Sequence, residues 1–166
     1  MAETKPQARP TGEALRVRVE DLQRRYVRNI DDGSIEGWPD FFTADCRYLI
    51  VPKEAYDSGQ RVGFYYCDGR PMMQDRVTCL REAAIYEPQQ YRHVIGGTQI
   101  LDEANGVVVA ETDFMIVRTT QDGDMAIFAA GRYRDEVVFE NGEAKFKDKL
   151  VLTDSSRVDT LIAMPL

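Results

Sequence analysis

Histidine and cysteine are scarce in this chain of 166 residues, which has one histidine, His93, and three cysteines, Cys46, Cys67 and Cys79. A mononuclear non-haem iron site needs two histidines and a carboxylate, and a Cys2His2 iron–sulfur cluster also needs two histidines. A Cys3His zinc site would use all four of these residues, and they lack the paired spacing of zinc ligands. The sequence therefore predicts no metal or other cofactor in this chain.

Long apolar runs and basic clusters are also missing. No run approaches the roughly 18 apolar residues of a membrane span, and the first ten residues lack the apolar segment of a secretory signal. The cysteines form no C-x-x-C pair, which favours free thiols in a reducing cytoplasm. The net charge of -7 would repel phosphate backbones, so we expect neither a membrane nor a nucleic acid as a partner.

The composition is that of one globular domain. Hydrophobic residues make up 43% of the chain and charged residues 30%, which is the balance of a folded protein. A chain of this length buries roughly 70% of the surface that it exposes when unfolded. We expect residues 1–12 to form a flexible lead-in and residues 13–166 to form a single domain.

Hydrophobic periodicity predicts three helices in the first half of the chain. The first is amphipathic, and its apolar positions recur every three or four residues: Leu15, Val19, Leu22, Tyr26 and Ile30. A short second helix is expected to begin at Ser34. The third covers residues 72–86 and ends before Pro88.

The remaining segments have the alternating pattern of strands. Two short strands are expected at residues 47–51 and 61–66, with a loop between them. Four longer ones follow, over residues 93–101, 107–120, 125–139 and 144–152, and tight turns join the last three as antiparallel hairpins. Because the helices come first, they can cover one face of such a sheet. We expect an α+β fold in which a curved antiparallel sheet wraps around N-terminal helices as a cone with a pocket at its wide end.

His93 is a candidate general acid or base, because imidazole titrates near neutral pH. The groups that would assist it are Tyr26 and the acidic residues Asp31, Asp32, Asp40 and Asp45. The alternative is a structural hydrogen bond or an interface contact. We favour this alternative, because no motif fixes a second catalytic group.

Three other patterns invite a functional interpretation. The aromatic residues 64–66 would line a pocket or, as is commoner, pack in the core. Lys145, Lys147 and Lys149 alternate along one strand, which predicts a solvated face. Residues 122–124 (DGD) lack the further ligands of a calcium loop and are expected to form a turn. We find no phosphate loop, nucleophile motif or nucleotide fingerprint.

Several segments together resemble the small (beta) subunits of aromatic-ring-hydroxylating dioxygenases of the Rieske non-haem iron type. The segments are residues 38–43 (WPDFFT), 75–87, 91–96 (YRHVIG) and 159–166 (DTLIAMPL), and the resemblance covers nearly everything after Gly12. Terephthalate dioxygenase and salicylate hydroxylase, which act on carboxylated rings, are the most similar in character. The chain departs from the family's usual Arg-x-Arg-His at Gln90.

The resemblance implies a cystatin-like cone, as in nuclear transport factor two, scytalone dehydratase and steroid isomerase. It also implies that a large (alpha) subunit carries the Rieske cluster and the mononuclear iron, while this chain is metal-free and non-catalytic. A reductase or ferredoxin would deliver electrons. Three large and three small subunits, with contacts among the small ones, would form the complex.

Contacts with neighbouring subunits are expected from Trp38, Tyr91, Arg92, His93, Arg157, Leu161, Met164 and Leu166. Residues 154–166 are too apolar to trail in water, so we expect them to pack across their own sheet and against neighbouring subunits. Two hypotheses stay open: a non-catalytic oxygenase subunit, and a stand-alone dehydratase or isomerase that uses His93 with an acidic partner.

Overall fold

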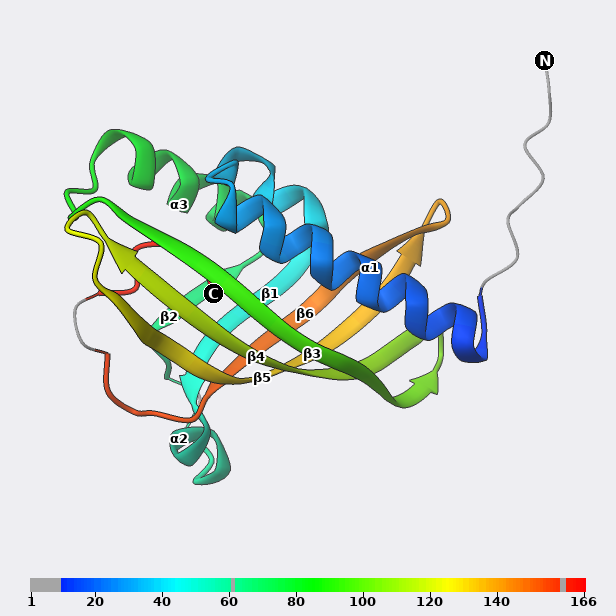
Figure 1. Ribbon diagram of the computed structural model, residues 1–166. Coiled ribbons are helices and arrows are strands. Elements are labelled where there is room, and N and C mark those ends of the chain that lie inside the picture. Colours follow the sequence, from blue (N-terminus) through cyan, green and yellow to red (C-terminus); the bar gives the residue numbers. More distant parts are fainter. Residues whose placement is uncertain (1–9, 61, 159–160) are drawn as a thin grey trace, which may run out of the picture.

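The computed structural model describes residues 10–60, 62–158 and 161–166 and has a layer of helices on a six-stranded sheet (Figure 1). The strand order is β2-β1-β6-β5-β4-β3. The helices are α1 (Gly12–Asp31), the 3-10 helix η1 (Ile35–Phe41), α2 (Lys53–Asp57) and α3 (Arg70–Glu82). The strands are β1 (Phe42–Pro52), β2 (Tyr65–Asp68), β3 (Gln89–Ala104), β4 (Val107–Thr120), β5 (Met125–Glu140) and β6 (Glu143–Thr153).

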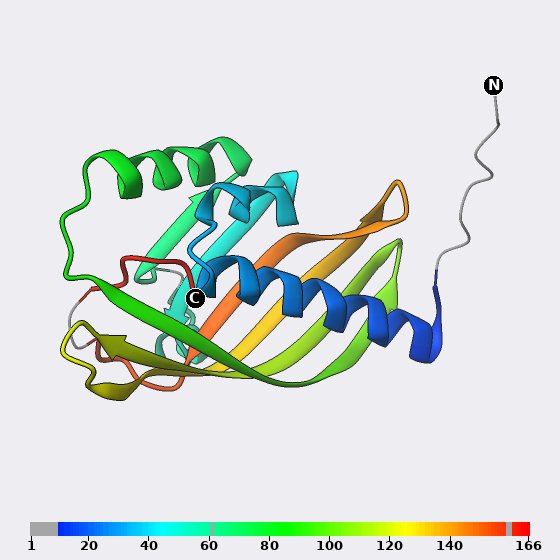
Figure 2. The same ribbon diagram turned by 45° about the horizontal axis from the view of Figure 1, so that its top comes forward.

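Helix α1 lies along the concave face of the sheet (Figure 2). It buries the five predicted apolar side chains together with Gln23 and Val27. The helix ends where the sequence predicts, because Asp32 closes the last turn and Gly33 has a φ of 72°, a conformation that glycine adopts without strain. This confirms the amphipathic helix, and its apolar stripe places Tyr26 and Asp31 inside the cone.

Strands β3 to β6 form the predicted antiparallel meander. Asn141 and Gly142 both have positive φ, 52° and 83°, as the predicted tight hairpin requires. Asn105 and Gly106 make the same kind of turn, with φ of 52° and 85°. One pair differs from the expected antiparallel sheet, because β1 runs parallel to β6. This parallel pairing is possible because a long crossover, which includes β2 to β5, separates the two strands in sequence.

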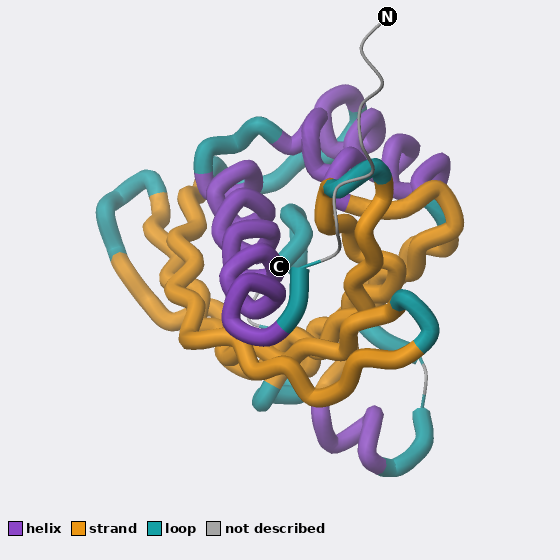
Figure 3. The backbone as a smooth tube through the Cα atoms, turned by 90° about the vertical axis from the view of Figure 1, so that its right-hand side faces the viewer, coloured by secondary structure: helices purple, strands orange, loops and turns teal. Residues whose placement is uncertain are grey.

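The sheet curves around α1, as the view in Figure 3 shows. Register shifts interrupt the β3–β4, β4–β5 and β5–β6 pairings, and bulges of this kind bend a sheet. The shift in β6 falls at Lys147, since Phe146 pairs with Val137 and Asp148 pairs with Glu136. One extra residue exchanges the two faces of a strand. The predicted solvated lysine face is therefore wrong for Lys149, which points into the core.

Several element boundaries also differ from prediction. Helix α2 occupies the expected loop between the two short strands, and its Ala55 and Tyr56 cover a small apolar cluster on the outer face of the sheet. Strand β2 is Tyr65–Asp68 rather than residues 61–66, and Arg61 lies outside the described residues. Helix α3 ends at Glu82. Helix α2 was not predicted because its five residues are too few to show a helical periodicity.

Candidate functional site

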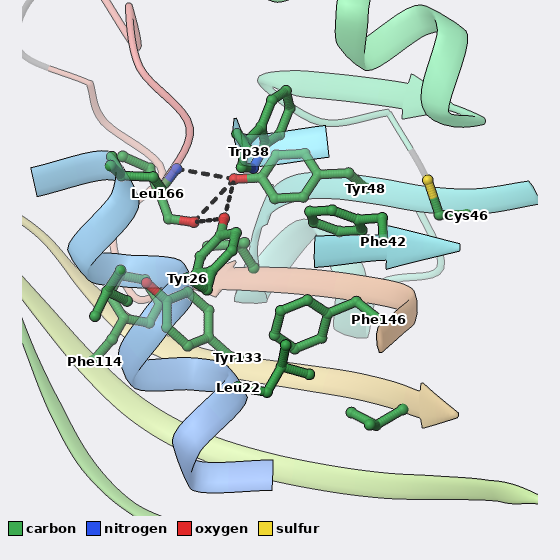
Figure 4. Packing of buried hydrophobic residues seen from close by; sticks show 14 of the residues in the cluster. Leu22, Tyr26, Trp38, Phe42, Cys46, Tyr48, Phe114, Tyr133, Phe146 and Leu166 are labelled. Atoms are coloured by element: carbon green, nitrogen blue, oxygen red, sulfur yellow. Dashed lines mark hydrogen bonds between the residues drawn. The ribbon is translucent and has the colours of Figure 1, made fainter. Parts of the chain in front are cut away.

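The concave side of the sheet and α1 enclose an aromatic core (Figure 4). Tyr26 lies at its centre and meets four other rings edge to face, at centroid distances of 5.4 to 6.3 Å: Phe41, Phe42, Tyr133 and Phe146. Trp38 and Tyr48 pack against each other at 5.2 Å. The Tyr26, Trp38, Tyr48 and Tyr133 side chains are fully buried, so the interior of the cone is filled.

The C-terminal segment ends inside this core. Leu166 is 1% exposed, and its carbonyl oxygen accepts hydrogen bonds from Tyr26 Oη at 2.7 Å and Tyr48 Oη at 3.0 Å. Its backbone N–H donates to Tyr48 Oη at 2.9 Å. Burial raises the pKa of both tyrosines well above the usual 10, so both hydroxyls remain protonated donors. The segment thus enters the cone, whereas we expected it to pack across the sheet.

Asp31 and His93, two of the alternative catalytic residues, do come together. Asp31 Oδ1 lies 2.6 Å from His93 Nδ1, and Asp31 Oδ2 accepts the backbone N–H of His93 at 2.9 Å. Both side chains are buried, and His93 Nε2 has no hydrogen-bond partner in the part of the chain that the structure describes. Tyr26, the third candidate, bonds to Leu166 instead. The pair links α1 to β3 and has the geometry of an acid–base dyad.

A second polar group in the interior escaped the sequence analysis. Lys149 Nζ lies 3.2 Å from Asp135 Oδ2 and 3.0 Å from Gln23 Oε1, and Gln23 Nε2 donates to Asp135. The ammonium also sits over the rings of Tyr133 at 3.8 Å, Phe146 at 4.3 Å and Tyr26 at 4.6 Å. All three polar residues are fully or almost fully buried.

Burial dominates the protonation of this group. It lowers the pKa of Lys149 to about 8 and raises the pKa of Asp135, while the attraction between the two charges opposes both changes. A sequence signal for Asp135 did exist, because Tyr133, Asp135 and Val137 alternate on one strand face. Lys149 had none, since the bulge at Lys147 cannot be read from the sequence.

The eight predicted interface residues divide into two sets. Four are buried within their own chain, and their contact with a partner stays a prediction: Trp38, Tyr91, His93 and Leu166. Tyr91, for example, stacks on Phe128 with a centroid distance of 4.9 Å. The other four have accessible surface, and their contact with a partner stays a prediction: Arg92, Arg157, Leu161 and Met164.

A narrow pocket opens beside the C-terminal segment. It is open to solvent, and its lining includes Phe64, Phe128, Ile162 and Leu166. The aromatic residues 64–66 therefore differ in role. Phe64 lines this pocket, Tyr65 packs on Tyr48 at 5.8 Å, and Tyr66 is 44% exposed.

Potential metal ligands do not gather among the described residues, where no group of three or more His, Cys, Asp or Glu side chains could hold an ion. Cys46 and Cys67 are buried, Cys79 is exposed, and all three are free thiols. No helix within residues 10–60, 62–158 and 161–166 is long and apolar enough to cross a membrane.

Known proteins with similar sequences include components of dioxygenases. Residues 25–160 match the family model of the ring hydroxylating beta subunit. The chain is 41% identical over 145 residues to the anthranilate 1,2-dioxygenase small subunit of Burkholderia cepacia, a match that covers 87% of this chain and 90% of the relative. It is 34% identical over 150 residues to a beta subunit of the terminal oxygenase component of terephthalate 1,2-dioxygenase from Comamonas sp., covering 90% and 97%.

The fold agrees with this relationship. The crystal structure of the beta subunit of a proposed aromatic-ring-hydroxylating dioxygenase from Novosphingobium aromaticivorans superposes with a TM-score of 0.84 at 32% identity, covering 91% of this chain and 96% of that one. The expected cone, its curved sheet and its N-terminal helices are thereby confirmed. The chain belongs to the family of small, or beta, subunits of aromatic-ring-hydroxylating dioxygenases.

Proposed function

We propose that this chain binds a large oxygenase subunit and stabilises it, while the chemistry takes place in that partner. The observation that carries the proposal is the match to beta subunits over residues 25–160, in a chain whose single histidine is too few for an iron site or a Rieske cluster. The Rieske cluster and the mononuclear iron would belong to the large subunit. A reductase or ferredoxin would supply electrons to the complex, in the cytoplasm.

The substrates of the complex would be carboxylated aromatic rings. Two relatives support this class, since one is named for anthranilate and the other for terephthalate, both of them ring carboxylates. The assembly would contain three large and three small subunits. Arg92, Arg157, Leu161 and Met164 are the accessible residues that we assign to its interfaces.

Co-expression with a candidate large subunit tests the proposal. The large subunit should contain the Cys-x-His and Cys-x-x-His pairs of a Rieske site. We expect the two chains to co-purify, with iron present in the complex and absent from this chain when it is purified alone. With a reductase and a reduced nicotinamide cofactor added to supply electrons, oxygen uptake should occur with anthranilate, terephthalate or benzoate and should require both subunits. Stoichiometric iron in the isolated chain, or full activity of the large subunit alone, would contradict the proposal.

The hydrogen bond between Asp31 and His93 supports a second candidate function, that of a dehydratase or isomerase. Its Nδ1–Oδ1 distance of 2.6 Å is short enough for the carboxylate to orient the imidazole as a general base. Under this alternative the isolated chain would turn over a small carbonyl or hydroxyl substrate, and His93→Ala would lower that rate by a hundredfold or more. A full-length chain with no such activity on a panel of hydroxy ketones would exclude it.

A further inference from the structure

Two tyrosine hydroxyls from different elements converge on one backbone oxygen inside the cone. Tyr26 of α1 and Tyr48 of β1 donate to the Leu166 carbonyl oxygen over 2.7 and 3.0 Å, and Figure 4 shows these bonds among the aromatic rings. The surroundings are apolar and closed to solvent, since Leu166 is 1% exposed. Paired donors in apolar surroundings are how binding pockets orient a carbonyl or carboxylate group.

The two donors are positioned by groups other than Leu166. The Tyr26 ring is held between Phe146, at 5.4 Å, and the other rings around it. The Tyr48 ring packs on Trp38 at 5.2 Å and on Phe42 at 6.0 Å. All of these side chains extend from α1, η1, β1 and β6, which are packed together in one core. The donor pair would therefore keep its geometry if Leu166 withdrew.

Two further polar atoms belong to the same cluster. Tyr133 Oη is buried without a hydrogen bond to any other described residue, and the Tyr133 ring lies 6.3 Å from the Tyr26 ring. Trp38 Nε1 is buried as well, and its N–H lowers the pKa of the Tyr26 hydroxyl as a hydrogen-bond donor. Buried polar atoms are normally paired, and an unpaired one is unfavourable. The unpaired Tyr133 hydroxyl beside the tyrosine pair indicates a site that can serve one more hydrogen bond than Leu166 uses.

Leu166 also separates this cluster from solvent. Leu166 lines the narrow pocket, whose other walls include Phe128, Thr153 and Ile162. The same residue carries the oxygen that the tyrosines bind. Withdrawal of Leu166 would therefore join the pocket to the tyrosine pair and give a small molecule a route to them.

We propose that the tyrosine pair and the aromatic rings around it form a binding site for a small apolar compound with one carbonyl or carboxylate oxygen, and that Leu166 occupies this site in the structure. The oxygen of the compound would replace the Leu166 carbonyl oxygen between Tyr26 and Tyr48. Its apolar body would replace the leucine side chain. The site belongs to this chain alone, so the inference does not depend on the proposed oxygenase function.

Ligand binding to the isolated chain tests the proposal with the native chain and two variants. A chain that lacks residues 163–166 empties the site, and Leu166→Gly keeps the backbone oxygen but removes the side chain that holds it in the cone. The probes are cyclohexanone, which is neutral, cyclohexanecarboxylate, which is anionic, and methylcyclohexane, which has a similar shape without an oxygen. Trp38, the single tryptophan, lies beside Tyr48 and reports binding by its fluorescence. We expect both variants to bind at least one oxygen-bearing probe at least tenfold more tightly than they bind methylcyclohexane, and tenfold more tightly than the native chain does. Which of the two binds identifies the charge that the site accepts.

A second set of variants tests the role of the hydroxyls. In the Leu166→Gly background, Tyr26→Phe with Tyr48→Phe should remove the preference for the oxygen-bearing probes. Tyr91→Phe, which removes a buried hydroxyl elsewhere in the cone, should keep it. Equal binding of methylcyclohexane, or no saturable binding to a variant with native circular dichroism, would overturn the proposal. If neither shortened nor substituted chain folds, Leu166 is an indispensable part of the core, and the proposal is wrong as well. If only the truncated chain unfolds, the Leu166→Gly result decides.

Discussion

Gln23, Asp135 and Lys149 form a charged group in the driest part of the molecule. Removing an ammonium and a carboxylate from water is expensive, and their attraction in the interior offsets that expense only when the geometry is good. Here the amide of Gln23 bonds both charges, and three aromatic rings face the ammonium. Each ring adds a modest cation–π attraction. We therefore expect the fold to tolerate apolar replacements of all three residues together, but not the loss of one charge alone.

Removing one charge of the group should destabilise the fold far more than replacing all three residues with apolar ones. We expect Lys149→Met to lower the free energy of unfolding by about 3 to 5 kcal/mol, because it leaves the Asp135 charge buried without its partner. The triple variant Gln23→Leu, Asp135→Leu, Lys149→Met should lie within about 1 kcal/mol of the native chain or exceed it. Denaturant unfolding measures both. A triple variant as unstable as the single one would show that the charges stabilise the fold.

The same group should make stability depend on pH. Burial lowers the pKa of Lys149 from 10.5 to about 8, so between these values the unfolded chain binds a proton that the folded chain has lost. Stability must then rise with pH across this window, by about 3 kcal/mol in total. At each pH, the unfolding free energy of the triple variant is subtracted from that of the native chain. This removes the contribution of tyrosines, which titrate in the unfolded chain in a similar pH range. A difference that stays flat from pH 8 to 10 would contradict the lowered pKa.

His93 joins β3 to α1, and we expect it to matter for assembly more than for turnover. His93→Ala removes one partner of a short contact, the imidazole, and leaves the buried Asp31 carboxylate with the backbone N–H at residue 93. The expected loss is about 2 to 3 kcal/mol in unfolding free energy, with a weaker complex but near-normal turnover per intact complex. Val94→Ala, a change at the neighbouring residue, which is 50% exposed, controls for local disruption of the strand. A hundredfold fall in turnover with normal assembly would instead make His93 catalytic.

At the scale of the elements, the close packing of β5 against β6 requires a glycine at position 131. A Cβ added at Gly131 would lie 2.0 Å from the Leu152 carbonyl oxygen of β6, which is far inside van der Waals contact. We expect Gly131→Ala to lower the unfolding free energy by about 3 kcal/mol, because the two backbones must separate. Gly97→Ala in β3 is the matched control, since a Cβ there meets nothing within 4 Å. Thermal or denaturant unfolding compares them, and equal stabilities would mean that β5 and β6 can move apart freely.

Helices and strands could be predicted from the sequence where the hydrophobic pattern extends over many residues or a turn has characteristic residues. Helix α1 and the hairpin at Asn141 and Gly142 follow from apolar spacing and from turn chemistry. Helix α2 was missed because five residues carry no period. The inward turn of Lys149 was missed because a one-residue bulge reverses every later side chain of the strand. The parallel pairing of β1 with β6 was missed because it joins distant segments.

For the whole molecule, the accessible part of the C-terminal segment should serve assembly. Leu161 is 48% exposed and lies a few residues before the anchored Leu166. We expect Leu161→Asp to weaken association with the large subunit or among small subunits at least tenfold, while the isolated chain keeps its melting temperature. Leu101→Asp is the control, since Leu101 is also 48% exposed but belongs to the far end of β3. Sedimentation with the partner measures this, and equal effects of the two changes would remove Leu161 from the interface.

The sequence by itself determined the fold class, the position of α1 and of the hairpin at Asn141 and Gly142, the lack of ligands for a metal, and the family to which the chain is similar. These depend on local spacing and on residue counts, which one chain displays in full. Only the tertiary structure decided that Asp31 holds His93, that Lys149 and Asp135 meet in the interior, and that Leu166 fills the cone between Tyr26 and Tyr48. Each of these joins residues more than ten positions apart. Such contacts depend on how the sheet bends and where its register shifts, and no local pattern of residues encodes that geometry.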